Sequence, residues 1–152
     1  MERRLSSPVF KDNVIYFGGD NGNVYAVDAA TGHQIRKRAT NGPVPATPSI
    51  ADGTVYVGSY DGKFYALNAQ TGALKWRFTT DGERRFEATG LHGMQPKDQM
   101  IADLFFFHSS WREAPIVATD EQFRIGGIFS SPLVVNGVVY FGCVDGFLYA
   151  LE

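Results

Sequence analysis

Short runs of apolar residues alternate with turn residues along most of the chain, and this pattern predicts β-strands joined by tight turns. In the clearest example, the apolar runs 54–58 and 64–67 are separated by Asp61-Gly62. Both runs are rich in β-branched and aromatic residues, which favour strands, and Asp-Gly favours a type I′ hairpin turn. The next turn ends at Gly72, which can take positive φ and form a β-bulge before a fourth strand.

The same pattern occurs three times. Residues 6–40 match residues 46–80 without a gap at an offset of forty, and residues 130–152 match part of the unit at an offset of 84. The shared positions include a strand glycine and a Tyr-Ala pair in each copy: Gly18, Gly58 and Gly142, and Tyr25, Tyr65 and Tyr149. A period of about forty residues with four short strands is typical of propeller blades. We therefore predict an all-β partial β-propeller of four-stranded antiparallel blades, with two full blades and part of a third.

Residues 81–129 interrupt the repeat. The two offsets differ by 44, so this stretch holds 44 positions that the first two copies lack. It is interpreted as a long insertion or linker between blades, since nothing in it reproduces the series Tyr-x-Gly…Asp-Gly…Tyr-Ala; a decayed extra blade is the alternative. The stretch includes the apolar run 104–107, which has to be covered by the blades, a partner or a ligand, and two histidines, His92 and His108.

Composition and charge narrow the function classes. A chain of 152 residues with 44% hydrophobic and 20% charged residues predicts one globular domain, residues 1–152. Its net charge of −2 lacks the excess of positive charge that is typical of nucleic-acid-binding domains. With Cys143 as the one cysteine, no disulfide can form within the chain. No run of about 18 apolar residues that would span a membrane is present, and from the first residues we expect no signal peptide.

The repeat carries a recognisable motif. Gly-x-x-Asp-Gly-x-x-Tyr-Ala-x-[Asp/Asn]-Ala-x-Thr-Gly-x-x-x-Trp runs without exception from Gly58 to Trp76, and in the first copy Arg36 replaces the Trp. This motif resembles the blade motif of pyrroloquinoline-quinone (PQQ) type β-propellers. As a blade residue, Trp76 is expected to be buried and Arg36 to be partly exposed.

The resemblance implies a function as well as a fold. It suggests a non-catalytic scaffold that binds proteins in the bacterial cell envelope, similar to the outer-membrane assembly factor lipoprotein, with a periplasmic or otherwise extracytoplasmic parent. The alternative is a fragment of a PQQ-dependent quinoprotein dehydrogenase of the alcohol type. Too few blades are present to close a propeller of typically 4–8 blades. The chain is therefore expected to be a fragment whose partners are the missing blades or other proteins, or to self-associate through open blade edges.

The PQQ-dependent enzymes that share the motif hold PQQ beside a calcium ion, and calcium prefers carboxylate and amide oxygens as ligands. Four residues of that type, Asp20, Asn21, Asp61 and Asp145, sit at positions that the turns already explain. His92 and His108 have no recognised ligand spacing. We therefore assign no catalytic, cofactor-binding or metal-binding residue, and we expect PQQ and calcium only in an intact enzymatic parent.

Overall fold

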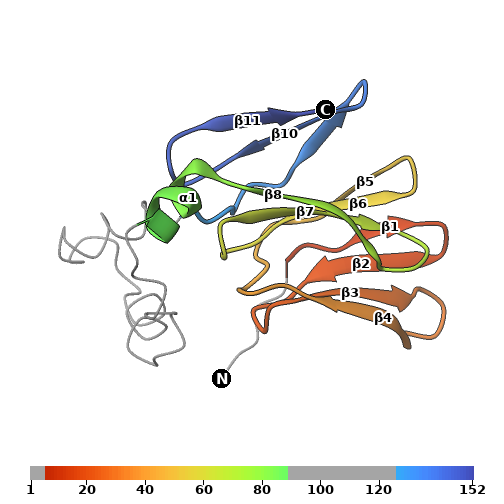
Figure 1. Cartoon of the computed structure of the whole chain (residues 1–152). Helices are drawn as coiled ribbons and strands as arrows, with labels where there is room; N and C mark the ends of the chain where they lie inside the picture. Colours follow the sequence, from red (N-terminus) through yellow and green to blue (C-terminus); the bar gives the residue numbers. More distant parts are fainter. Residues whose placement is uncertain (1–5, 89–125) are drawn as a thin grey trace, which may run out of the picture.

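The structure is a computed structural model that describes residues 6–88 and 126–152 (Figure 1). In these residues, eleven strands form three antiparallel sheets that follow one another along the chain. The first sheet contains β1 (Val9–Lys11), β2 (Val14–Gly18), β3 (Asn23–Asp28) and β4 (Gln34–Ala39) in that order. The second contains β5 (Ser49–Ala51), β6 (Thr54–Gly58), β7 (Lys63–Asn68) and β8 (Leu74–Thr79). The third contains β9 (Leu133–Val135), β10 (Val138–Gly142) and β11 (Leu148–Leu151). The predicted partial propeller of antiparallel blades is thus confirmed.

The sheets share one register. Tyr16 lies opposite Ala26 in the first sheet, and the equivalent tyrosines of the other two sheets lie opposite Ala66 and Ala150. Between the third and fourth strands the register shifts at Ala26/Val27 and at Ala66/Leu67. The turns that follow end in glycines with positive φ, 72° at Gly32 and 73° at Gly72. The first two sheets therefore have the same strand order and the same bulge, as the forty-residue repeat predicts.

One turn prediction is wrong. A type I′ turn needs positive φ at both central residues, but of the pair Asp61-Gly62 only Gly62 has it. The side chain of Asp61 accepts a hydrogen bond from the Lys63 N–H at 2.9 Å, and this local bond favours a longer loop that ends in a single left-handed glycine. Consecutive positive φ values, the mark of type I′ turns, occur instead between the first two strands of each sheet: at Asp12-Asn13, Asp52-Gly53 and Asn136-Gly137.

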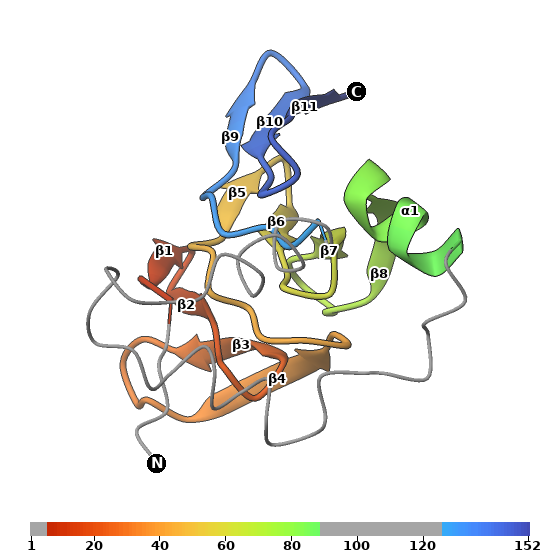
Figure 2. The same ribbon diagram turned by 90° about the vertical axis from the view of Figure 1, so that its left-hand side faces the viewer.

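The sheets pack face to face, and their first strands lie side by side, with β1 next to β5 and β5 next to β9 (Figures 1 and 2). Between the first two sheets the core is formed by Tyr16, Val24 and Ala26 on one side and by Val55, Val57, Tyr65 and Leu67 on the other. Between the second and third sheets, Phe64 stacks on Phe141 with ring centroids 4.2 Å apart. Both residues are almost fully buried, so the second and third sheets are in direct contact.

The prediction that Trp76 is buried is only partly right, because the residue is half-buried. It packs on Tyr56 and Phe64, with centroids about 6 Å from each. However, it lies on the outermost strand β8, and the described third sheet has no fourth strand to lie across from it. Arg36, its counterpart, is half-buried as expected, and its guanidinium donates a hydrogen bond to the carbonyl oxygen of Ala69 in the neighbouring sheet.

Candidate functional site

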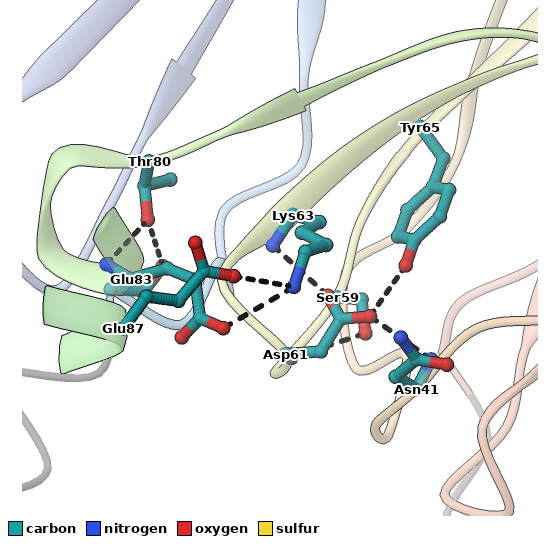
Figure 3. Close-up of polar contacts among 9 residues, drawn as sticks. Asn41, Ser59, Asp61, Lys63, Tyr65, Thr80, Glu83 and Glu87 are labelled. Atoms are coloured by element: carbon teal, nitrogen blue, oxygen red, sulfur yellow. Dashed lines mark hydrogen bonds and ion pairs between the residues drawn. The ribbon is translucent and has the colours of Figure 1, made fainter. Parts of the chain in front are cut away.

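A group of polar contacts lies at one end of the second sheet, where the linker from the first sheet crosses the β6–β7 turn (Figure 3). Asp61 Oδ2 accepts hydrogen bonds from the Asn41 N–H at 3.0 Å and from the Tyr65 hydroxyl at 2.5 Å. The hydroxyl of Ser59, which is fully buried, lies 3.1 Å from the carbonyl oxygens of both Gly42 and Pro43. These contacts fix the linker to the second sheet through backbone groups.

The same arrangement recurs 84 positions later, between the second and third sheets. Asp145 Oδ2 accepts hydrogen bonds from the Gly82 N–H at 3.2 Å and from the Tyr149 hydroxyl at 2.7 Å. Burial alone would raise the pKa of Asp145, but these hydrogen bonds hold it below its ordinary value. Cys143 takes the place of Ser59, and its sulfur lies 3.0 Å from the carbonyl oxygen of Gly126. Burial raises the pKa of this thiol to about 12, so it stays protonated and donates.

The second junction is built from two separate pieces of chain. Gly82 and Gly126 both correspond to Gly42 of the first junction, by the offsets of forty and 84. They touch one another: a Cβ added to Gly82 would lie 2.7 Å from the Cα of Gly126. Ile128 then enters the position that Val44 takes in the first junction. The extra residues therefore begin and end at one point of the linker, and the sheets on either side pack directly on each other.

A helix that the sequence analysis did not predict begins at this point. α1 (Asp81–Ala88) follows Thr80, whose buried hydroxyl accepts a hydrogen bond from the Glu83 N–H at 3.3 Å. The same hydroxyl donates to the Gly126 carbonyl oxygen at 3.1 Å. Residues 80–83 have the pattern Thr-x-x-Glu, which is the capping box found at helix N-termini. This pattern in the sequence could have predicted the start of α1.

Two ion pairs hold α1 against the β6–β7 turn (Figure 3). The ammonium group of Lys63 lies 3.2 Å from Glu83 Oε1 and 3.6 Å from Glu87 Oε1. Burial raises the pKa of Glu83 above its ordinary value, although Lys63 acts in the opposite direction. Arg84 and Arg85 are exposed, and the guanidinium of Arg84 pairs with Asp81 at 3.4 Å and lies 5.1 Å from the ring centroid of Phe78. The helix thus presents two cations next to the ends of the inserted segment.

Two of the aspartates whose oxygens could serve as calcium ligands are engaged in hydrogen bonds within the chain. Asp61 and Asp145 use both carboxylate oxygens to accept N–H and O–H hydrogen bonds, including those from Lys63 and Phe147. Within residues 6–88 and 126–152, no group of three His, Cys, Asp or Glu side chains is placed to hold a metal ion. His92, His108 and the apolar run 104–107 lie outside the described residues. In the described part of the chain, no helix is long and apolar enough to cross a membrane.

Comparison with known proteins gives a family and a fold. The model of the family described as outer membrane protein assembly factor BamB matches residues 2–120. No curated protein sequence matches the chain.

Among solved structures, BamB from Moraxella catarrhalis is 18% identical with a TM-score of 0.60, over 95% of this chain and 32% of that one. Quinohemoprotein alcohol dehydrogenase ADHIIG from Pseudomonas putida HK5 is 23% identical with a TM-score of 0.64, over 97% of this chain and 18% of that one. The WD40 β-propeller domain of Doa1 is 15% identical with a TM-score of 0.59, over 97% of this chain and 35% of that one. The chain thus spans only part of each, and these likenesses show the propeller fold.

Proposed function

Because the chain belongs to the family of the outer membrane protein assembly factor BamB, we propose that it is a non-catalytic scaffold that binds other proteins in the bacterial cell envelope. The observation that carries this proposal is the contact between Gly82 and Gly126. It lets the linker carry 44 extra positions while the stacking of Phe64 on Phe141 is kept. Insertions on a rigid scaffold are where proteins commonly place their binding residues. The proposed binding surface is therefore α1, which lies where the two ends of the insertion meet.

The polar groups at this end of the molecule support a role in protein binding better than a role in catalysis. Asp61, Ser59 and Asp145 are held in hydrogen bonds to linker backbone, where they join one sheet to the next. Arg84 and Arg85 of α1 are exposed charged groups at this end; Arg84 pairs with Asp81 at 3.4 Å and lies over the ring of Phe78. Exposed guanidinium groups beside a fixed helix suit contacts with carboxylates of a protein partner.

The test is site-specific photo-cross-linking in bacteria that carry the chain in the periplasm. A benzophenone amino acid replaces Arg85, and in the matched control it replaces Gln70, which is exposed at the opposite end of the second sheet. We expect position 85 to cross-link to components of outer-membrane protein assembly, identified by mass spectrometry, and position 70 not to do so. Equal products from both positions, or products from neither, would reject this surface.

A second candidate is a part of a PQQ-dependent alcohol dehydrogenase, which is favoured by the likeness to ADHIIG over 97% of the chain. Because PQQ and calcium are expected only in an intact enzymatic parent, the intact parent protein is titrated with PQQ and Ca²⁺ while quinone absorbance and dye-linked alcohol oxidation are followed. The scaffold proposal expects no saturable change in either signal. Saturable quinone binding with dye reduction would replace it by the enzymatic candidate.

A further inference from the structure

The outer part of the space between the first two sheets differs in chemistry from the space between the second and third. Trp76 and Phe78, on the outer strand of the second sheet, pack against the apolar core that this sheet shares with the third. The ring of Phe78 contacts that of Tyr149 with centroids 5.4 Å apart. The equivalent positions of the first sheet hold Arg36 and Arg38. Two guanidinium groups thus take the place of two aromatic rings.

Both arginines lie on the side of β4 that faces the second sheet. Arg36 is opposite Ala26 in the ladder and Arg38 is opposite Val24, and both of these partners are buried in the core between the first two sheets. The two sheets meet at β1 and β5 and diverge towards β4 and β8 (Figure 2). A groove lies between β4 and the turn that precedes β8, and besides the two arginines its walls include Leu67, Asn68 and Ala69.

One of the two guanidinium groups is held in place. Arg36 is half-buried and donates a hydrogen bond to the carbonyl oxygen of Ala69. Its side chain passes over Gly72, since a Cβ at that glycine would lie 3.3 Å from Cδ of Arg36. Burial raises the pKa of the Tyr16 hydroxyl in the adjoining core, and the positive charge of Arg36 acts in the opposite direction. A guanidinium group has five N–H donors, so the bond to Ala69 leaves others for a ligand.

The positive charge beside the groove is not neutralised within the part of the chain that the structure describes. Arg38 is exposed, and so is Arg77 of β8, which faces the first sheet because it lies opposite the core residue Tyr65. Neither Arg38 nor Arg77 forms an ion pair with another residue of the ranges 6–88 and 126–152. None of the described residues that line the groove is acidic. The groove therefore suits an anionic ligand.

The strand that carries these arginines is also the outer edge of its sheet. Within the described sheet, β4 has a ladder partner on one side only, which is β3. It contains Arg36, Lys37 and Arg38 and no acidic residue. An extended peptide can pair with such an edge through its backbone, and its alternate side chains then lie on one face. Because Arg36 and Arg38 are two positions apart, they match carboxylates at alternate positions of such a peptide.

We infer that β4 binds an extended acidic segment of a protein partner, with carboxylates at alternate positions of the segment paired to Arg36 and Arg38 in the groove. The charges select the segment, and the backbone hydrogen bonds to β4 fix its register. The residues that form this site belong to the first two sheets and to the turn between β7 and β8, and none of them belongs to α1. The inference is therefore independent of the surface proposed at α1 and of its partners.

Fluorescence anisotropy with the full chain at pH 7 tests this inference. The probe is a labelled peptide in which Glu and Val alternate, and in the control peptide Gln replaces Glu. We expect saturable binding of the Glu peptide that weakens as salt is added, because exposed charge pairs are screened, and no binding of the Gln peptide. Equal binding of both peptides, or binding of neither, would overturn the inference. Equal affinity for a DNA oligonucleotide of the same charge would show a general polyanion site and would overturn it as well.

Substitutions test whether the arginines hold the peptide. Arg38→Gln removes one charge-assisted pair and should weaken binding about tenfold. Lys11→Gln is the matched control, because Lys11 is an exposed cation on β1 at the other edge of the same sheet, and it should leave binding unchanged. The double variant Arg36→Trp/Arg38→Phe places the aromatic residues of the second sheet in the groove. It should remain folded by far-UV circular dichroism and lose the peptide. Unchanged binding by Arg38→Gln, or binding retained by the folded double variant, would reject the site.

Discussion

Replacing Gly58 by alanine probes the contact that joins the second sheet to the third. A Cβ at this position would lie 2.2 Å from Cγ2 and 2.6 Å from Cβ of Ile128, which is fully buried. Distances this short cannot be accommodated without displacing Ile128. Gly142 is the matched control, because it holds the same repeat position and a Cβ there would meet only Ser130, at 3.7 Å.

The magnitude follows from two opposing effects. Forcing a methyl group into a filled site costs about 1–3 kcal/mol. Replacing glycine by alanine in an extended strand with negative φ restores about 0.5–1 kcal/mol by reducing the freedom of the unfolded chain. We therefore expect Gly58→Ala to lower the free energy of unfolding by about 1–2 kcal/mol. Gly142→Ala meets no obstacle, so it should be neutral or slightly stabilising.

Urea unfolding measures both variants at one protein concentration. The transition midpoint should fall for Gly58→Ala with an unchanged slope. Ile128→Ala removes Cγ2, the carbon atom nearest to the methyl group that Gly58→Ala adds. The destabilisations of the two single variants should therefore add up to about 0.5–3 kcal/mol more than the destabilisation of the double variant. If Gly58→Ala is as harmless as Gly142→Ala, Ile128 does not occupy this position.

Three further predictions concern the outer strand and α1. Trp76→Ala should cost about 2 kcal/mol by urea unfolding, below the ~3–5 kcal/mol of a fully buried tryptophan, because Trp76 is half-buried; a cost in the full range would contradict that exposure. Thr80→Ala should cost about 1–2 kcal/mol and speed hydrogen exchange in α1, whereas Thr80→Ser, which keeps the capping hydroxyl, should not; equal exchange in both variants would argue against the cap. Folding raises the pKa of Glu83, so this carboxyl group adds stability below its unfolded pKa of about 4.5, and that stability is lost as the pH rises through the folded value. Glu83→Gln should remove this fall while keeping the capping-box pattern, and an unchanged pH profile of stability would rule out Glu83 as its source.

The repeat determined most of the fold. Its turn residues and apolar runs predict the strands of the first two sheets, their order and the bulge before the fourth strand, because these depend on local φ preferences and on strand propensity. The residues at the inter-sheet junctions were visible in the sequence only as turn residues. Asp61 and Asp145 were correctly attributed to turns, but their bonds to the linker backbone needed the neighbouring sheet to be in place.

Some features were decided only by the tertiary structure. The exposure of Trp76 depends on which strands lie across from β8, and no local pattern contains that information. Likewise, Gly18, Gly58 and Gly142 occupy the same position of the repeat. The space that a Cβ would need is occupied by Val44 at Gly18 and by Ile128 at Gly58, but it is open at Gly142. The sequence by itself determined what each blade is, since a blade is held by contacts between neighbouring strands. The packing of one sheet on the next determined which faces are covered, since those contacts join residues far apart in the chain.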